Sequence, residues 1–214
     1  MSSLLKVGLM VLSIAGLSSC GQPGRLAAFA ASAKQRGENT AEIFDKVPRV
    51  TSNNLESALK ESSVVLAIAL PKQVVVTTPD TVGTWQFVKI EQWLSQVPSR
   101  PFDCGQLPRP PAVPSADEAV LGIGSGTTTI DGVEISVTTE ASIKFTPGQL
   151  YLLLVGKCPN QEIKLIYGEQ SVYLVDKTGA ISAPRSETFD PFAQELLGAK
   201  TVDAITERIR NASR

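Results

Sequence analysis

The sequence predicts a mainly β fold, a small antiparallel barrel with short N-terminal helices and a C-terminal helix. Short apolar or alternating segments recur through the middle of the chain, and turn residues separate them. Helical periodicity is confined to the two ends, and the absence of strand–helix alternation excludes a doubly wound α/β fold. The 214 residues are 43% hydrophobic, which is enough apolar content for a packed core.

The first 19 residues have the pattern of a secretory signal peptide. Lys6 precedes an apolar run over residues 7–16, and small residues follow the run. The run is too short to cross a bilayer as a helix. We expect residues 20–53 to form a tether that carries short helices over residues 25–31 and 41–47, because alanine and leucine favour the first and Pro48 ends the second.

The tetrapeptide Leu17-Ser18-Ser19-Cys20 resembles the lipobox of bacterial lipoprotein precursors. The resemblance implies cleavage before Cys20 and acylation, with palmitate or a similar chain, of its thiol and of the new N-terminus. Several acyl chains together anchor a protein firmly in a membrane. By analogy with that family, Gly21 in place of an aspartate implies the periplasmic face of the outer membrane if the host is Gram-negative.

Residues 54–184 are expected to form the barrel domain. Asn54 is a good N-cap for a helix over residues 55–61. The expected strands are 63–70 with an extension to 76, 83–93, 119–123, 127–139, 150–155, 163–167, 171–175 and 180–181. Asp131-Gly132 predicts a hairpin turn within the fourth of them.

Two further segments complete the expected organisation. Six prolines between residues 98 and 114 predict a long loop, because proline cannot donate to a strand ladder. Residues 185–214 are predicted to be helical over 192–197 and 201–211, where apolar residues recur at three- and four-residue steps.

Several motifs occur together in this order: the helix and strand over 55–70, a strand that ends in Trp93-Leu94, the Asp131-Gly132-Val133 turn and Phe145-x-Pro-Gly148-x-x-Tyr151. Together they resemble an uncharacterised set of exported bacterial domains with an OB-like, tissue-inhibitor-type β-barrel. The similarity covers about residues 55–182. It implies an OB-like fold and carries no function across.

Once Cys20 is assigned to the lipid, Cys104 and Cys158 remain as an even pair in an exported chain. We predict a disulfide between them, which would tie the proline-rich segment to the strand over 150–155. The alternatives are two free thiols or a metal pair, although two cysteines without histidine make a poor metal site.

The composition excludes several functions. Lys and Arg total 20 and Asp and Glu total 21, so neither charge sign favours nucleic acid as a partner. The chain has no histidine, which excludes Ser-His-Asp and Cys-His catalysis and His-ligated zinc. We therefore expect a non-catalytic module with no cofactor and no metal.

A Ser/Lys or carboxylate enzyme is the alternative. Ser57 and Lys60 fit S-x-x-K, and residues 177–179 fit K-T-G, but the S-D-N signature that should lie between them is missing. Ser57 is therefore expected to be an ordinary helix residue. Carboxylates at residues 117–118 and at Glu187 and Asp190 could form an acid–base pair, with solvated loop charge as the simpler interpretation.

The expected ligand surface, if the module binds an envelope protein or a glycan, combines aromatic rings with a glycine-rich segment. Trp85 and Trp93 supply the rings, and Gly122, Gly124 and Gly126 supply the segment. Core packing of the rings and a bulge or hairpin at the glycines are the simpler interpretations. The glycines lack the following lysine or helix that a phosphate loop requires.

Overall fold

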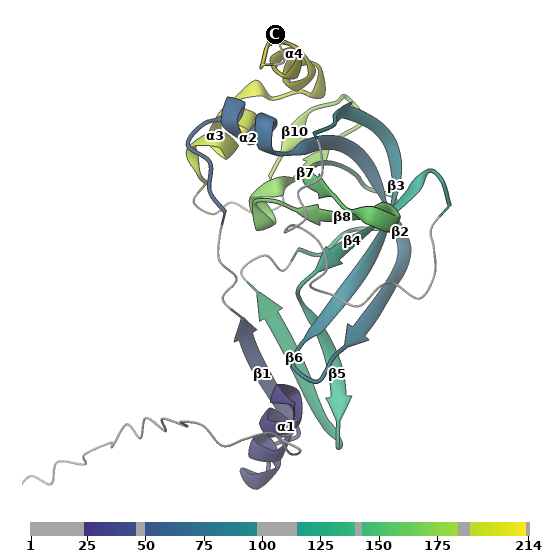
Figure 1. Cartoon of the computed structure of the whole chain (residues 1–214), viewed down its shortest axis with the longest axis vertical. Helices are drawn as coiled ribbons and strands as arrows, with labels where there is room; N and C mark the ends of the chain where they lie inside the picture. The colour runs from purple at the N-terminus through teal and green to yellow at the C-terminus, as the bar shows by residue number, and fades with distance from the viewer. Residues whose placement is uncertain (1–23, 46–49, 98–114, 140–142, 184–188, 213–214) are drawn as a thin grey trace, which may run out of the picture.

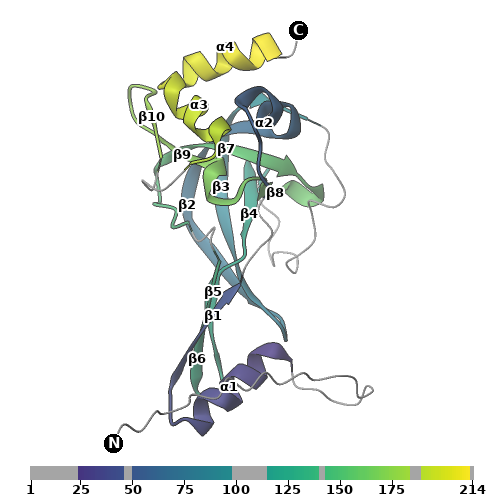
Figure 2. The same ribbon diagram turned by 90° about the vertical axis from the view of Figure 1, so that its left-hand side faces the viewer.

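The computed structural model describes residues 24–45, 50–97, 115–139, 143–183 and 189–212. In this part of the chain ten strands form two sheets, and four α-helices lie at the two ends of an elongated molecule (Figures 1 and 2). The predicted mainly β fold is confirmed. Cys20, Cys104 and the proline-rich segment lie outside the described residues.

Most of the strands fall within the expected β segments. The strand over residues 40–45 was not expected. The strands are β1 (Thr40–Asp45), β2 (Ser63–Thr77), β3 (Val82–Ser95), β4 (Glu118–Ile123), β5 (Gly126–Ile130), β6 (Val133–Thr139), β7 (Leu150–Lys157), β8 (Glu162–Leu165), β9 (Val172–Val175) and β10 (Ile181–Ser182). The helices are α1 (Arg25–Gln35), α2 (Leu55–Glu61), α3 (Pro191–Ala199) and α4 (Val202–Ala212), with 3₁₀ turns η2 (Pro159–Gln161) and η3 (Gly168–Ser171).

Five strands close into an OB-like ring. The seven-stranded sheet has the order β10-β9-β7-β2-β3-β4-β8, and β8 also pairs with β7. The ring is antiparallel except between β4 and β8, which run parallel. All five ring strands contribute to one buried cluster, in which Val65, Val88, Leu121, Leu153 and Ile163 take part. This cluster therefore fills the interior of the barrel.

The Pro71 region of β2 departs from regular pairing. The register between β2 and β3 shifts between Ala69 and Gln73, since a proline cannot donate to the ladder. The buried Gln86 side-chain amide on β3 donates to the carbonyl oxygens of Leu70 and Lys72, at 2.8 and 3.3 Å. It thereby supplies hydrogen bonds to carbonyl groups at the register shift.

The Phe145 to Tyr151 motif holds the start of β7 against this irregular part of β2. Gly148, at φ 80°, donates its N–H to the carbonyl of Ala69, and the Tyr151 hydroxyl accepts from the N–H of Thr146 at 2.8 Å. The rings of Phe145 and Tyr151 meet edge to face, with centroids 4.9 Å apart. The motif therefore has a structural role.

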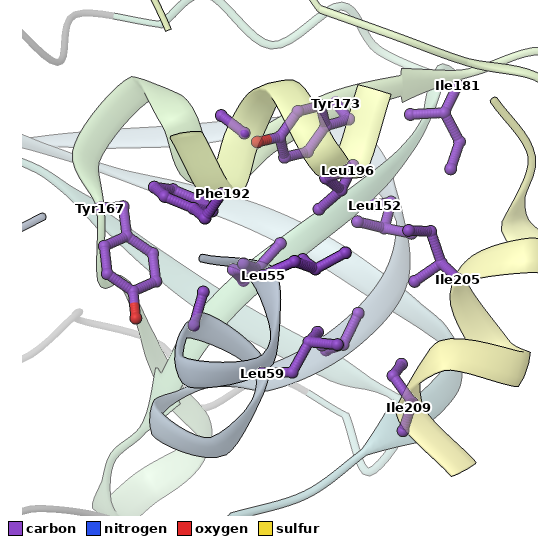
Figure 3. Close-up of a cluster of buried hydrophobic side chains, with 14 of the residues drawn as sticks. Leu55, Leu59, Leu152, Tyr167, Tyr173, Ile181, Phe192, Leu196, Ile205 and Ile209 are labelled. Carbon is purple, nitrogen blue, oxygen red and sulfur yellow. The ribbon is translucent and has the colours of Figure 1, made fainter. Parts of the chain in front are cut away.

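Helices α2, α3 and α4 cover the outer face of β2, β7, β9 and β10, and we call them the helical cap (Figure 3). Phe192 and Leu196 of α3 are fully buried, and the Phe192 ring lies 4.5 Å from the ring of Tyr167. Ile205 and Ile209 of α4 extend the same cluster. The predicted C-terminal helices are confirmed.

The second sheet, of order β1-β6-β5, packs with α1 at the opposite end of the molecule, and we call these elements the lower lobe (Figures 1 and 2). The prediction of a helix over residues 41–47 was wrong. Thr40–Asp45 is a strand that pairs in parallel with β6. Ile43 packs with Leu26 in the buried cluster under α1, and this tertiary contact outweighs the helix propensity of Ala41 and Glu42.

The described part of the expected tether is folded onto the body. The N–H groups of Arg25 and Leu26 donate to the Asp80 carboxylate and the Pro79 carbonyl, in the turn between β2 and β3. A Cβ at Gly24 would collide with Pro79, so the chain approaches this turn too closely for any other residue. The start of α1 is therefore fixed to the body by the β2–β3 turn.

Candidate functional site

Ser57 and Lys60, the candidate catalytic pair, do not meet. Both lie on α2, which Asn54 caps through a 2.8 Å hydrogen bond from the N–H of Ser57. Lys60 Nζ instead lies 2.6 Å from Glu56 Oε1, one turn earlier. This hydrogen bond holds the pKa of the Glu56 carboxyl below its usual range. Within the described residues the geometry leaves Ser57 as a helix residue and gives it no base.

The K-T-G segment is the hairpin turn that the sequence also predicts. Asp176 Oδ1 accepts hydrogen bonds from the Thr178 hydroxyl, at 2.7 Å, and from the N–H groups of Thr178 and Ala180. These bonds lower the pKa of the Asp176 carboxyl. Gly179 takes a φ of 81°, which the turn requires. Residues 177–179 therefore serve the β9–β10 hairpin.

Trp85 is not available at the surface. Its side chain is fully buried in a cluster with Phe87 and Val120, on the opposite side of the barrel wall from the interior cluster. Its backbone pairs with Gly122 on β4. The predicted ligand surface is therefore wrong at Trp85, because packing on the β2–β3–β4 face removes the ring from solvent, and the core-packing interpretation holds there.

Trp93 lies at the other end of β3 and is half-buried. It is eight residues from Trp85, a separation of about 26 Å along a strand. Its ring packs at the edge of the interior cluster, and Lys157 Nζ lies 4.8 Å from the ring centroid. The same Nζ donates to Gln96 Oε1 at 2.7 Å. The two tryptophans consequently do not share one binding surface.

The glycine-rich segment carries the chain from one sheet to the other. β4 pairs with β3 in the barrel, whereas β5 pairs with β6 in the lower lobe. Gly124 is exposed at the bend, and a Cβ at Gly126 would lie 2.8 Å from a methyl group of Val82. The segment is therefore a crossing point that needs a small residue at Gly126, and its residues show no arrangement typical of a phosphate loop.

The candidate carboxylates are separated or incompletely described. Asp117 is exposed at the start of β4, where Oδ1 accepts from the Ser115 hydroxyl at 2.9 Å. Asp190 immediately precedes α3, and Glu187 lies outside the described residues. Cys158 precedes η2 at the end of β7, and its predicted partner Cys104 lies outside the described residues as well.

A pair of buried hydrogen-bond donors near the start of α3 was not predicted. The Tyr173 hydroxyl and the Gln170 Nε2 group are buried and lack a hydrogen-bond partner among the described residues. Gln170 Oε1 accepts from the N–H of Asp190 at 2.8 Å, which holds η3 against α3. Burial, followed by the charge of Asp190, raises the pKa of Tyr173. Such a pair ordinarily binds an ordered water or another acceptor.

Neither a metal centre nor a membrane-spanning helix is found in the part of the chain that the structure describes. Its residues form no group of three or more Cys, Asp or Glu side chains placed to hold a metal ion. None of its helices is both long enough and apolar enough to span a bilayer. No protein-family model matches the sequence, and no curated protein or solved structure matches it either.

Proposed function

We propose that this chain is a membrane-anchored lipoprotein of the bacterial cell envelope that acts as a non-catalytic binding or structural module. The observation that carries the proposal is the signal-like segment that ends in Leu17-Ser18-Ser19-Cys20. The described residues begin at Gly24, four residues after Cys20. An acylated Cys20 would therefore hold the lower lobe close to the membrane surface. An envelope protein or a glycan is the proposed class of partner.

The arrangement of the candidate catalytic residues supports the module over the Ser/Lys enzyme. The Lys60 ammonium is bound to Glu56, and the K-T-G residues are used by the β9–β10 hairpin. A Ser/Lys mechanism requires the amine to act as a base on the serine hydroxyl. Neither motif is held in a geometry that would do so.

The anchor is tested with the full-length chain expressed in a bacterial host with labelled fatty acid. We expect the wild-type protein to carry the label and to sediment with membranes, whereas Cys20→Ala loses both the label and the cleavage before residue 20. Ser19→Ala is the matched control, since it keeps a small residue before Cys20 and leaves the thiol in place. Equal labelling of wild type and Cys20→Ala would overturn the proposal.

We also propose that Cys104 and Cys158 form a disulfide in the exported protein. Support comes from the sequence, in which an even pair of cysteines remains after Cys20 is assigned to the lipid. The bridge would close a loop of about 54 residues, which corresponds to about 4 kcal/mol in the chain-entropy account. Mass spectrometry after alkylation without reductant should find both thiols blocked, and two alkylated cysteines would disprove the bridge.

A further inference from the structure

Helix α1 is the first element that the structure describes after Cys20. In both ribbon views it lies at one pole of the long axis, and α4 lies at the other (Figures 1 and 2). Arg25, its first residue, is five positions after Cys20. Since each residue spans at most about 3.6 Å, the α-carbon of Gly24 lies within about 14 Å of that of Cys20.

The attachment of α1 to the body fixes which side of the helix faces outward. Leu26, Ala30 and Ala33 are fully buried against the three-stranded sheet. The Arg25 guanidinium lies 2.6 Å from the Asp45 carboxylate on β1, and the Arg25 N–H binds Asp80. Contacts at both the start and the inner face hold α1 on the sheet and define which of its residues face outward.

The outward surface of α1 combines small residues with one exposed aromatic ring and no acidic side chain. Ala28, Ala31 and Ser32 are exposed on its outer side. Phe29 is 39% exposed on one flank and Lys34 is exposed on the other. Small residues between the two flanks would let the helix lie low on a flat surface, where an aromatic ring and a lysine suit the boundary between lipid headgroups and acyl chains.

Phe44 provides an internal contrast, because it is also exposed but faces elsewhere. Ile43 points into the cluster under α1, and successive residues of a strand point to opposite faces. Phe44 therefore lies on the face of the three-stranded sheet that α1 does not cover, and it is 56% exposed. Exposure of an aromatic ring alone does not place it beside the anchor.

We infer that the outward surface of α1 lies against the bilayer that holds the acylated Cys20, with Phe29 in the interfacial layer. The inference rests on the proposed lipid anchor and adds the face by which the domain meets the membrane. The anchor keeps this surface within a short distance of the bilayer at all times, so a weak intrinsic affinity is enough for sustained contact. The α4 pole then points away from the membrane.

Site-specific photocrosslinking of the full-length lipidated protein tests this orientation. p-Benzoylphenylalanine replaces Phe29, Phe44 or Glu207 in three separate variants, and each is reconstituted into vesicles of phosphatidylethanolamine and phosphatidylglycerol. We expect lipid adducts at position 29 at a yield several-fold higher than at position 44, and no lipid adduct at position 207 on α4. All three positions are exposed, so thermal unfolding should show that each variant remains folded.

The outcomes separate this inference from the proposed function. Intact mass measurement of each variant first reports whether Cys20 is acylated. If Cys20 is acylated but positions 29 and 44 give equal lipid yields, the anchor stands and the orientation is wrong. Adducts at position 29 that contain protein instead of lipid would also overturn it, because α1 would then contact a partner protein. An unmodified Cys20 would remove both proposals.

Discussion

The helices at both ends of the molecule pack against a sheet. The helical cap and α1 differ, however, in the side chains that they bury and in those that they expose. The helical cap buries large residues such as Phe192, Leu196 and Ile205, whereas α1 buries one leucine and two alanines. On the outside, α4 exposes charges of both signs and α1 exposes an aromatic ring with no acidic residue.

This difference indicates two ways of holding a helix in place. The cap is stabilised mainly by apolar burial, which depends on the volume of the buried side chains. The small residues of α1 bury less surface, and hydrogen bonds to the β2–β3 turn and the ion pair with Asp45 add to their contribution. The cap is therefore expected to be sensitive to loss of volume, and α1 to changes in its attachment.

The largest effect is expected from Phe192→Ala in the cap. Its ring is fully buried against Tyr167, so truncation should lower the free energy of unfolding by about 3–5 kcal/mol. Phe29→Ala, the same substitution on the outward surface of α1, should change it by less than about 1 kcal/mol. Urea titration compares them, and equal losses would contradict the placement of the Phe29 ring on the exposed side of α1, beside the Arg25 guanidinium.

A smaller effect is expected where the chain joins α1. Gly24→Ala should lower the free energy of unfolding by about 1–3 kcal/mol, because the new methyl group must displace Pro79. Gly198→Ala in α3 is the control, since its Cβ would meet open space and the change should stabilise by up to about 1 kcal/mol. Hydrogen exchange should rise over α1 in the first variant only; a uniform rise over the whole protein would contradict a local attachment.

The smallest effect is expected from the helix caps themselves. Asn54→Ala removes the side-chain cap of α2 and should cost about 1 kcal/mol. Gly24 provides no side-chain cap for α1, and the Asp80 carboxylate serves in its place, so Asp80→Ala should cost a similar amount. Thermal unfolding measures the stability loss of each variant. An Asp80→Ala variant as stable as wild type would show that the Asp80 carboxylate does not cap α1.

Local chemistry in the sequence predicted much of the fold. Asp131 and Gly132 both take positive φ values, 50° and 80°, as an Asp-Gly hairpin turn requires. The apolar run at the start of β7 and the periodic C-terminal helices formed where expected. These elements depend on residues that are close in the sequence.

The elements that were missed depend on distant contacts. β1 pairs Thr40 with Glu134, and its short sequence favours a helix when it is considered alone. The burial of Trp85 also follows from packing between strands and cannot be derived from its aromatic type or its neighbours. The candidate ligand surface fails because the Trp85 ring is buried and Trp93 lies at the other end of β3, although Gly122 does pair with Trp85.

The central claim, that the α1 pole rests on the membrane and the α4 pole points away, is tested most directly by paramagnetic relaxation. The full-length lipidated protein is reconstituted in nanodiscs that contain a gadolinium-headgroup lipid, and methyl signals are followed for Ala28 and Ala31 of α1 and for Ile205 and Ile209 of α4. We expect the α1 signals to be broadened strongly and the α4 signals to be retained. Equal broadening at both poles, or stronger broadening at α4, would contradict the claim.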